Sequence, residues 1–267
     1  MVELTTLLQG YRLGTDQGDI AFCGVNLIEG PDESGALRRI VVDTGHTGRR
    51  SALEAALRQR GLSPDDIDMV VCTHAHWDHV ENLNIFSRAR IVIHETELRY
   101  ISRPHRNDFG CPEWIQGIFG LYKDRVTEVD EGTALIPGVE VVNAPGHSAG
   151  TIAISARTDA GIAVITGDSI QNSLVAVHRK NALVFWNDEQ ATRTIDKLLA
   201  VGDVIYPGHD QAFRILPGNQ VEYVQPLRLA LTKVSPEEPG LSFAPDNGLQ
   251  QVIMPGIEEQ QLPVLPG

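Results

Sequence analysis

The chain has 267 residues, of which 42% are hydrophobic and 21% charged, a composition typical of a soluble globular protein with a substantial core. Its formal charge of −13 at pH 7 opposes binding to nucleic acid and to acidic membranes. No stretch approaches the roughly 20 uninterrupted apolar residues of a membrane-spanning helix. The chain starts without an export signal and has three widely spaced cysteines, so we expect a cytoplasmic protein without a disulfide framework.

The first half of the chain alternates predicted strands with predicted helices. Residues 2–13 and 20–28 are predicted strands joined by a turn, and 37–42 is a third strand. Residues 49–60 carry apolar side chains at helical spacing ahead of Gly61, which predicts an amphipathic helix. The next predicted elements are a strand over 69–73, a helix that ends near Leu83, a strand over 90–94 and a helix over 95–101.

Periodicity is lost between residues 103 and 121, where helix breakers alternate with aromatic residues, and we interpret this segment as a functional flap. A helix over 188–200 is marked by Asn187 as its N-cap. A short helix is predicted near 221–232, and the chain beyond it is rich in Pro and Gly. The other predicted elements are strands over 125–129, 134–136, 139–143, 151–156, 162–166 and 203–206.

This order of elements predicts an α+β fold. Each half has strands followed by helices, which indicates a sandwich of two mixed sheets with helices outside, in four layers (αββα). We expect one domain over residues 1–235. Residues 236–267 would form a tail that packs on this domain or on the partner subunit of a homodimer.

The sequence Thr-His-Ala-His-Trp-Asp-His-Val-Glu at 73–81 follows an apolar strand and places three imidazoles and one carboxylate within six positions. Such side chains are preferred ligands of Zn²⁺. His74 and His76, two residues apart, would face one point, whereas Asp78 and His79 could face a neighbouring point. One loop can therefore begin two metal sites. The competing interpretation, a polar turn with ordinary histidines, is disfavoured by this density of ligand-type side chains.

Three later positions share a common design, in which a strand ends, a glycine allows a sharp turn, and a ligand-type side chain follows. His147 and His209 each come after a Pro-Gly pair, and Asp168 comes after Gly167. Glycine lets the backbone bend close to an ion without a clash from Cβ. Because strand ends at one edge of a sandwich can converge, these side chains are candidate partners of the histidine-rich loop.

The complete pattern, His-x-His-x-Asp-His followed by His, Asp and His, resembles that of the metallo-β-lactamase superfamily. The resemblance extends from about Leu7 to Leu216 and includes the Val-Asp-Thr-Gly sequence that begins at Val42. It implies an αββα sandwich with metals at one edge of the two sheets. It also implies two divalent ions, Zn²⁺ or alternatively Fe or Mn, and a hydroxide between them that attacks the substrate.

The resemblance also implies the role of each candidate ligand. The first metal would be bound by His74, His76 and His147, and the second by Asp78, His79 and His209. Asp168 would bridge the two ions, and Asp78 and Asp168 would be the catalytic carboxylates.

Four further residues are candidates for the surroundings of the metals. Asp43 either accepts hydrogen bonds near the ligands or simply ends a strand. His46 lies either at the mouth of the site or on a solvent-facing loop, and Trp77 packs beside the metals or lines the pocket. Where lactone-hydrolysing relatives often have a tyrosine three residues after the bridging aspartate, this chain has Gln171, a departure that weakens a lactonase assignment.

The favoured function is a dinuclear hydrolase that attacks the carbonyl of a small ester, lactone, thioester or amide. An apolar pocket lined by Trp77, Phe109, Trp114 and Phe119 would support it, whereas a basic patch would support a metal-dependent phosphodiesterase or ribonuclease instead. Residues 7–11, 82–86 and 207–216 are similar to compact metallo-β-lactamase-domain proteins, also found in animals, for which RNA cleavage has been proposed. Further interpretations compete with these: a flavodiiron-like redox protein that carries iron, a persulfide dioxygenase or glyoxalase-type hydrolase, and a structural site without catalysis.

Overall fold

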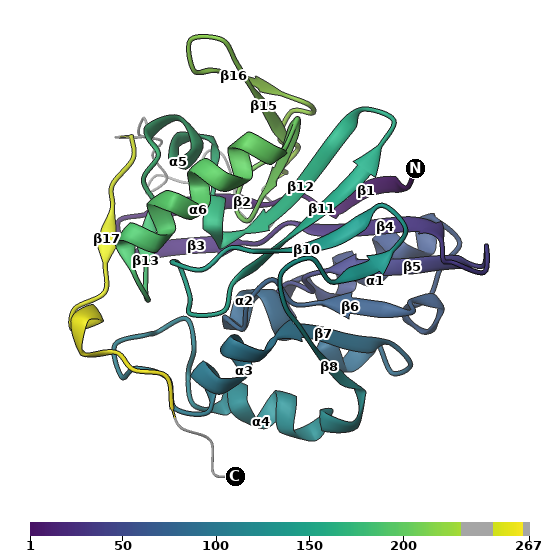
Figure 1. The fold of residues 1–267 in the computed structure, drawn as a ribbon, viewed down its shortest axis with the longest axis horizontal. Coiled ribbons are helices and arrows are strands. Elements are labelled where there is room, and N and C mark those ends of the chain that lie inside the picture. Colours follow the sequence, from purple (N-terminus) through teal and green to yellow (C-terminus); the bar gives the residue numbers. More distant parts are fainter. Residues whose placement is uncertain (231–247, 264–267) are drawn as a thin grey trace.

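The structure, a computed structural model, describes residues 1–230 and 248–263. Two mixed β-sheets stack face to face, with helices on both outer sides (Figure 1). The first sheet contains, in spatial order, β1 (Glu3–Leu8), β4 (Val25–Pro31), β5 (Leu37–Val42), β6 (Met69–Val71), β7 (Arg90–His94) and β8 (Val126–Val129). The second contains β16 (Gln220–Tyr223), β15 (Phe213–Leu216), β14 (Val204–Pro207), β12 (Gly161–Gly167), β11 (Ile152–Thr158), β10 (Val139–Asn143) and β9 (Ala134–Ile136).

Three apolar clusters define the four layers. One cluster fills the space between the two sheets and includes Ile28 of β4. The adjacent Leu27 points to the opposite side of the sheet and belongs to another cluster, because successive side chains of a strand alternate between its two faces. A second cluster joins the first sheet to α1, α3 and α4, and a third joins the second sheet to α5 and α6. The helices are α1 (Arg50–Gln59), α2 (Trp77–Val80), α3 (Glu95–Ile101), α4 (Trp114–Leu121), α5 (Ser173–His178) and α6 (Asp188–Val201). The predicted αββα sandwich is confirmed.

The predicted strands over 2–13 and 20–28 are each wrong in one respect, because each is divided into two. β2 (Tyr11–Thr15) and β3 (Gly18–Phe22) form a separate hairpin outside the main sheets. The breaks fall at Gly10 and Gly24, where the backbone meets the turn before His209. A Cβ on Gly10 would lie 2.5 Å from the carbonyl oxygen of Gly208. Close approach of this distant turn therefore interrupts both strands.

The predicted helix near 221–232 is wrong within the described residues. Residues 220–223 form strand β16, which pairs antiparallel with β15 through a tight turn. Gly218 and Asn219, two of the three residues in this turn, both have positive φ, which glycine and asparagine tolerate best. Residues 231–232 lie outside the described residues.

The segment predicted to be a flap over 103–121 ends in a regular helix, α4. Ile115 and Phe119 of this helix are buried in the apolar cluster beneath the first sheet, so Phe119 does not line a pocket. Trp114 and Phe109 remain exposed by 49% and 69%. The segment is thus a packed structural element with an exposed aromatic edge.

The C-terminal segment 248–263 runs along one edge of the molecule (Figure 1, yellow). Its short strand β17 (Val252–Ile253) pairs parallel with β13 (Leu183–Val184), and Met254 is buried. Of the predicted tail, residues 236–247 and 264–267 lie outside the described residues. The cytoplasmic location, the homodimer and the boundary at residue 235 stay predictions from the sequence.

None of the helices within residues 1–230 and 248–263 has both the length and the apolar character needed to cross a membrane.

Candidate metal centre

The seven predicted ligands, all buried, come together at one end of the two sheets. They follow the carboxyl ends of four strands: β6 leads into the loop with the first four ligands, and β10, β12 and β14 each lead to one more. Neighbouring strand pairs β5–β6 and β12–β14 are parallel, which places their carboxyl ends on the same edge. The seven residues are His74, His76, Asp78, His79, His147, Asp168 and His209.

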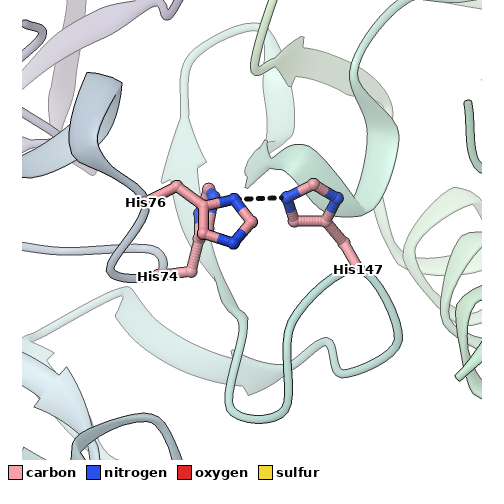
Figure 2. A group of neighbouring side chains, drawn as sticks. All are labelled: His74, His76 and His147. Carbon is pink, nitrogen blue, oxygen red and sulfur yellow. Dashed lines mark hydrogen bonds between the residues drawn. The ribbon is translucent and has the colours of Figure 1, made fainter. Parts of the chain in front are cut away.

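A first triad consists of His74, His76 and His147. Nε2 of His147 lies 3.0 Å from Nδ1 of His76, and Figure 2 shows these two rings facing each other from separate loops. The ring centre of His74 lies 4.5 Å from that of His76 and 4.9 Å from that of His147. One nitrogen from each ring can therefore reach a common point.

A second triad consists of Asp78, His79 and His209. Oδ2 of Asp78 lies 3.5 Å from Nε2 of His209 and 3.6 Å from Nε2 of His79. This triad combines two imidazoles with a carboxylate, whereas the first triad has imidazoles alone.

Asp168 lies between the two triads. Its Oδ1 is 3.1 Å from Nε2 of His209 and 3.3 Å from Nε2 of His79, while its Oδ2 is 3.5 Å from Nε2 of His147. The close approach depends on Gly208, because a Cβ there would lie 2.1 Å from Oδ1 of Asp168. Glycine before His209 therefore permits the approach of this turn to Asp168.

The donor atoms fit divalent cations. Buried polar atoms are almost always paired, yet several donor atoms here have no hydrogen-bond partner among the described residues. Imidazole nitrogens and carboxylate oxygens without partners, gathered within a few ångströms, are suited to bind metal ions. Those that face the centre are Nε2 of His74, Nε2 of His79 and Oδ1 of Asp168.

The sequence comparison agrees with this geometry. The profile of the family described as "Metallo-beta-lactamase superfamily" matches residues 27–209, more than half of the chain and the region that carries all seven residues. The chain belongs to the metallo-β-lactamase superfamily. It is accordingly a metal-dependent hydrolase.

Three relatives and one solved structure illustrate the similarity to other proteins. The "Metallo-beta-lactamase domain-containing protein 1" of Xenopus laevis is 32% identical over 226 residues, which cover 80% of this chain and 82% of the relative. Its human namesake is covered over only 62% of its length. The "N-acyl homoserine lactonase AiiB" of Agrobacterium fabrum is 32% identical over 117 residues, 40% of this chain and 41% of the lactonase. A probable metal-dependent hydrolase from Staphylococcus aureus, 18% identical, superposes with a TM-score of 0.70 over 86% of this chain and 98% of that one.

Asp43 of this superfamily member holds two ligand rings in place. Its Oδ2 accepts hydrogen bonds from Nδ1 of His79 at 2.8 Å and from Oγ1 of Thr73 at 2.9 Å. Oγ1 of Thr73 in turn lies 3.1 Å from Nδ1 of His74. A proton on Nδ1 of each ring leaves Nε2 free toward the centre, the usual arrangement of metal-binding histidines. Asp43 therefore contacts one ring of the second triad directly and one of the first through Thr73.

Burial and charge set the protonation of the site. Burial lowers the pKa of His147 to about 4 and that of His74 well below its usual value. Burial alone would raise the pKa of Asp168, but His209 and His79 hold it well below its usual range. The first triad thus offers two neutral rings at neutral pH, beside an ionised carboxylate.

Trp77 and His46 belong to an aromatic row beside the site of the hydrolase. The ring centre of His46 lies 5.7 Å from Trp77 and 5.0 Å from Phe22, which stacks on Tyr11 at 4.5 Å. His46 is not simply a solvent-facing loop residue, because it is half-buried and its Nδ1 accepts a hydrogen bond from the amide of Gly48.

Gln171 points away from the centre. Its Nε2 donates to Oδ1 of Asn181 at 2.8 Å and lies 3.3 Å from Nδ1 of His147. Its Oε1 accepts from the amide of Ala182. The side chain therefore supports the loop before β13 and is occupied by protein partners.

A second aromatic group covers the first triad. The ring of Phe185 packs edge-on against His76 at 4.9 Å and His147 at 5.4 Å, and the exposed Phe109 packs on Phe185 at 5.0 Å. Phe185 was not among the residues predicted to line a pocket, and no periodic pattern around it in the sequence indicates a position near the metal centre.

Two buried carboxylates near the first triad also escaped the sequence analysis. Oδ1 of Asp108 lies 3.4 Å from Nε2 of His76, and Asp108 accepts hydrogen bonds from the hydroxyl of Tyr100 and the amides of Gly110 and Cys111. Glu97 is fully buried. Each lies outside the ligand motif, so only its position in the fold distinguishes it from a surface carboxylate.

Proposed function

We propose that this superfamily member is a dinuclear, zinc-dependent hydrolase that cleaves a small ester, lactone, thioester or amide at its carbonyl group. The observation that carries the proposal is the pair of adjacent donor triads with Asp168 between them. His74, His76 and His147 would hold one ion, Asp78, His79 and His209 the other, and Asp168 both. Imidazole predominates in this donor set, which favours Zn²⁺ over Mn²⁺ or Mg²⁺.

Two such ions, when bound, would supply Lewis acidity toward the substrate carbonyl and would lower the pKa of a bound water toward about 7. The protein's part is to keep the donor atoms deprotonated and fixed. Nδ1 of His147 lies 2.6 Å from the carbonyl oxygen of Leu183, so this nitrogen donates its proton there and leaves Nε2 directed to the centre. Asp43 does the same for His79. The rings need little rearrangement to receive cations.

The surroundings support a small organic substrate. Two groups of aromatic side chains lie near the imidazoles: Phe185 packs on His76 and is covered by Phe109, and Trp77, within the histidine-rich loop, packs against His46. Such rings suit an acyl or other apolar group. A phosphodiester would instead be favoured by free cationic side chains near the centre.

Arg49, beside the aromatic row that contains Tyr11 and Phe22, already has hydrogen-bond partners in the protein. Its guanidinium donates to the carbonyl oxygens of Cys23 and Gln9 and lies 5.6 Å from the rings of Tyr11 and Phe22. The formal charge of −13 further opposes a polyanionic substrate. The similarity of 117 residues to a protein named as a lactonase points in the same direction.

The test combines metal analysis with a panel of substrates. Purified protein loaded with Zn²⁺ is expected to hold two ions per chain and to turn over at least one of a lactone, an aryl ester, a thioester and a β-lactam. A nitrophenyl phosphodiester serves as the opposing substrate. Turnover of the phosphodiester alone would contradict the proposed carbonyl chemistry, and a single bound ion would contradict the dinuclear centre.

A further inference from the structure

Glu97 is a fully buried carboxylate that belongs to neither donor triad. It is the third residue of α3, where a glutamate commonly turns back to cap the start of its own helix. Here Nδ1 of His94 already accepts the hydrogen bond from the amide of Thr96, at 2.9 Å. The side chain of Glu97 points into the protein instead.

The donors that Glu97 meets among the described residues lie close in sequence to predicted ligands. Its Oε1 accepts from the amide of Ala75 at 3.0 Å, and both carboxylate oxygens lie 2.7 Å from the hydroxyl of Ser148. Its Oε2 accepts from the amide of Gly150 at 2.8 Å. Ala75 separates His74 from His76, and Ser148 follows His147.

Helix α3 also packs closely against the loop that follows His147. A Cβ on Gly150 would lie 2.2 Å from the backbone nitrogen of Glu97, so only glycine permits this approach. The loop of His74 and His76 follows a strand of the first sheet, whereas the loop of His147 follows a strand of the second. The first triad is therefore assembled across the two sheets (Figure 2).

We propose that Glu97 is a positioning residue that sets the distance between these two loops and thereby forms the first triad. The inference rests on the proposed function of the triads as metal sites. A buried carboxylate with three neutral donors makes strong, charge-assisted hydrogen bonds, and these are short. Its negative charge also lies close to the cation that three neutral imidazoles would bind.

The test is Glu97→Gln, which keeps the size of the side chain and one acceptor oxygen. The NH₂ group of the new side chain cannot accept a hydrogen bond from the N–H of Ala75 or of Gly150, whichever it faces. One of the two loops therefore loses its hydrogen bond to residue 97. We expect the first triad to bind Zn²⁺ about 10- to 100-fold more weakly, as is typical when a partner of a metal ligand is removed. The second triad should keep its affinity.

The measurement is a stepwise titration of metal-free protein with Zn²⁺ against a chromophoric chelator, and with Co²⁺ followed by absorption, well below the unfolding temperature. Glu95→Gln is the matched control, because Glu95 is exposed on the same helix and should leave both affinities unchanged. Ser148→Ala keeps the carboxylate and removes one donor, and should weaken the first triad by about three- to tenfold. In the double variant the two losses should not add, because both act on one contact.

The outcomes separate the two proposals. If Glu97→Gln unfolds, Ser148→Ala alone decides the question. Variants that lower the unfolding temperature but keep wild-type affinity at both triads would show that Glu97 serves only folding. A wild-type protein that binds two ions but cleaves no carbonyl substrate would overturn the proposed substrate class and leave the role of Glu97 intact. A wild-type protein without a first ion would overturn both.

Discussion

The two triads at the centre of this protein obtain negative charge in different ways. In the second triad a carboxylate, Asp78, is itself one of the donors. In the first triad all three donors are imidazoles, and the carboxylates of Glu97 and Asp108 lie behind them. The second triad thus carries its charge within the motif, whereas the first depends on residues from elsewhere in the chain.

This difference predicts which substitutions should affect both triads and which should affect only one. Both sheets contribute to each triad, since His147 and His209 come from the second sheet. Asp168 and Asp43 contact members of both, directly or through Thr73, so changes there should affect the whole centre. Changes behind one triad should affect that triad alone.

The largest effect is expected for Asp168→Asn, which removes the anion between the triads. We expect loss of most bound metal and a decrease in kcat/KM of at least about 10³-fold, equivalent to about 4 kcal/mol. Metal content and steady-state kinetics on the best substrate provide the measurement. Asp159→Asn, on an exposed turn, is the control. Full activity in the Asp168 variant would refute a shared role for this residue.

A smaller effect on both triads is expected for Asp43→Asn. Its amide group would face Nδ1 of His79 or the Thr73 donors, which should weaken metal binding by about 10- to 100-fold. Asp43 has φ of +58°, a conformation that Asn tolerates and Ala does not. Asp43→Ala should therefore lose the same metal affinity and, in addition, about 1–2 kcal/mol of folding stability. Equal unfolding temperatures for the two metal-free variants would contradict the strain argument.

Phe109→Ser should affect substrate binding on the side of the first triad only. Phe109 is exposed and packs on Phe185, so its removal should cost little stability. For substrates with long apolar groups we expect KM to rise about three- to tenfold, because each lost methylene contact contributes up to about 0.8 kcal/mol. Short substrates should be unaffected. Trp114→Ser, another exposed aromatic residue nearby in the chain, is the control, and equal effects of both changes would argue against a specific contact.

The smallest effect on catalysis is expected for Gln171→Leu. The side chain supports the loop before β13, and its loss leaves the buried amide of Ala182 without a partner. We expect a loss of about 1–3 kcal/mol in the free energy of unfolding, with kcat/KM changed by less than about twofold. Denaturant unfolding and kinetics test this. A large increase in KM with unchanged stability would place Gln171 in contact with substrate after all.

Much of the centre could be predicted from the sequence because its candidate ligands follow simple local signals. His74, His76, Asp78 and His79 lie within six consecutive residues, and the remaining three each follow a strand and a glycine. The strands themselves follow from short runs of apolar residues, as at Leu27 and Ile28, whose side chains are buried on opposite faces of the sheet.

The sequence by itself thus determined the four-layer fold and the seven residues that meet, since each depends on local pattern or a short motif. Only the tertiary structure decided where the first strands break and which carboxylates support the rings. Gly10 and Gly24 interrupt their strands because a turn about 185 to 200 residues away in the sequence packs against them. Glu97 and Asp108 gain their roles from burial and from donors on distant loops, and no local pattern encodes contacts of that range.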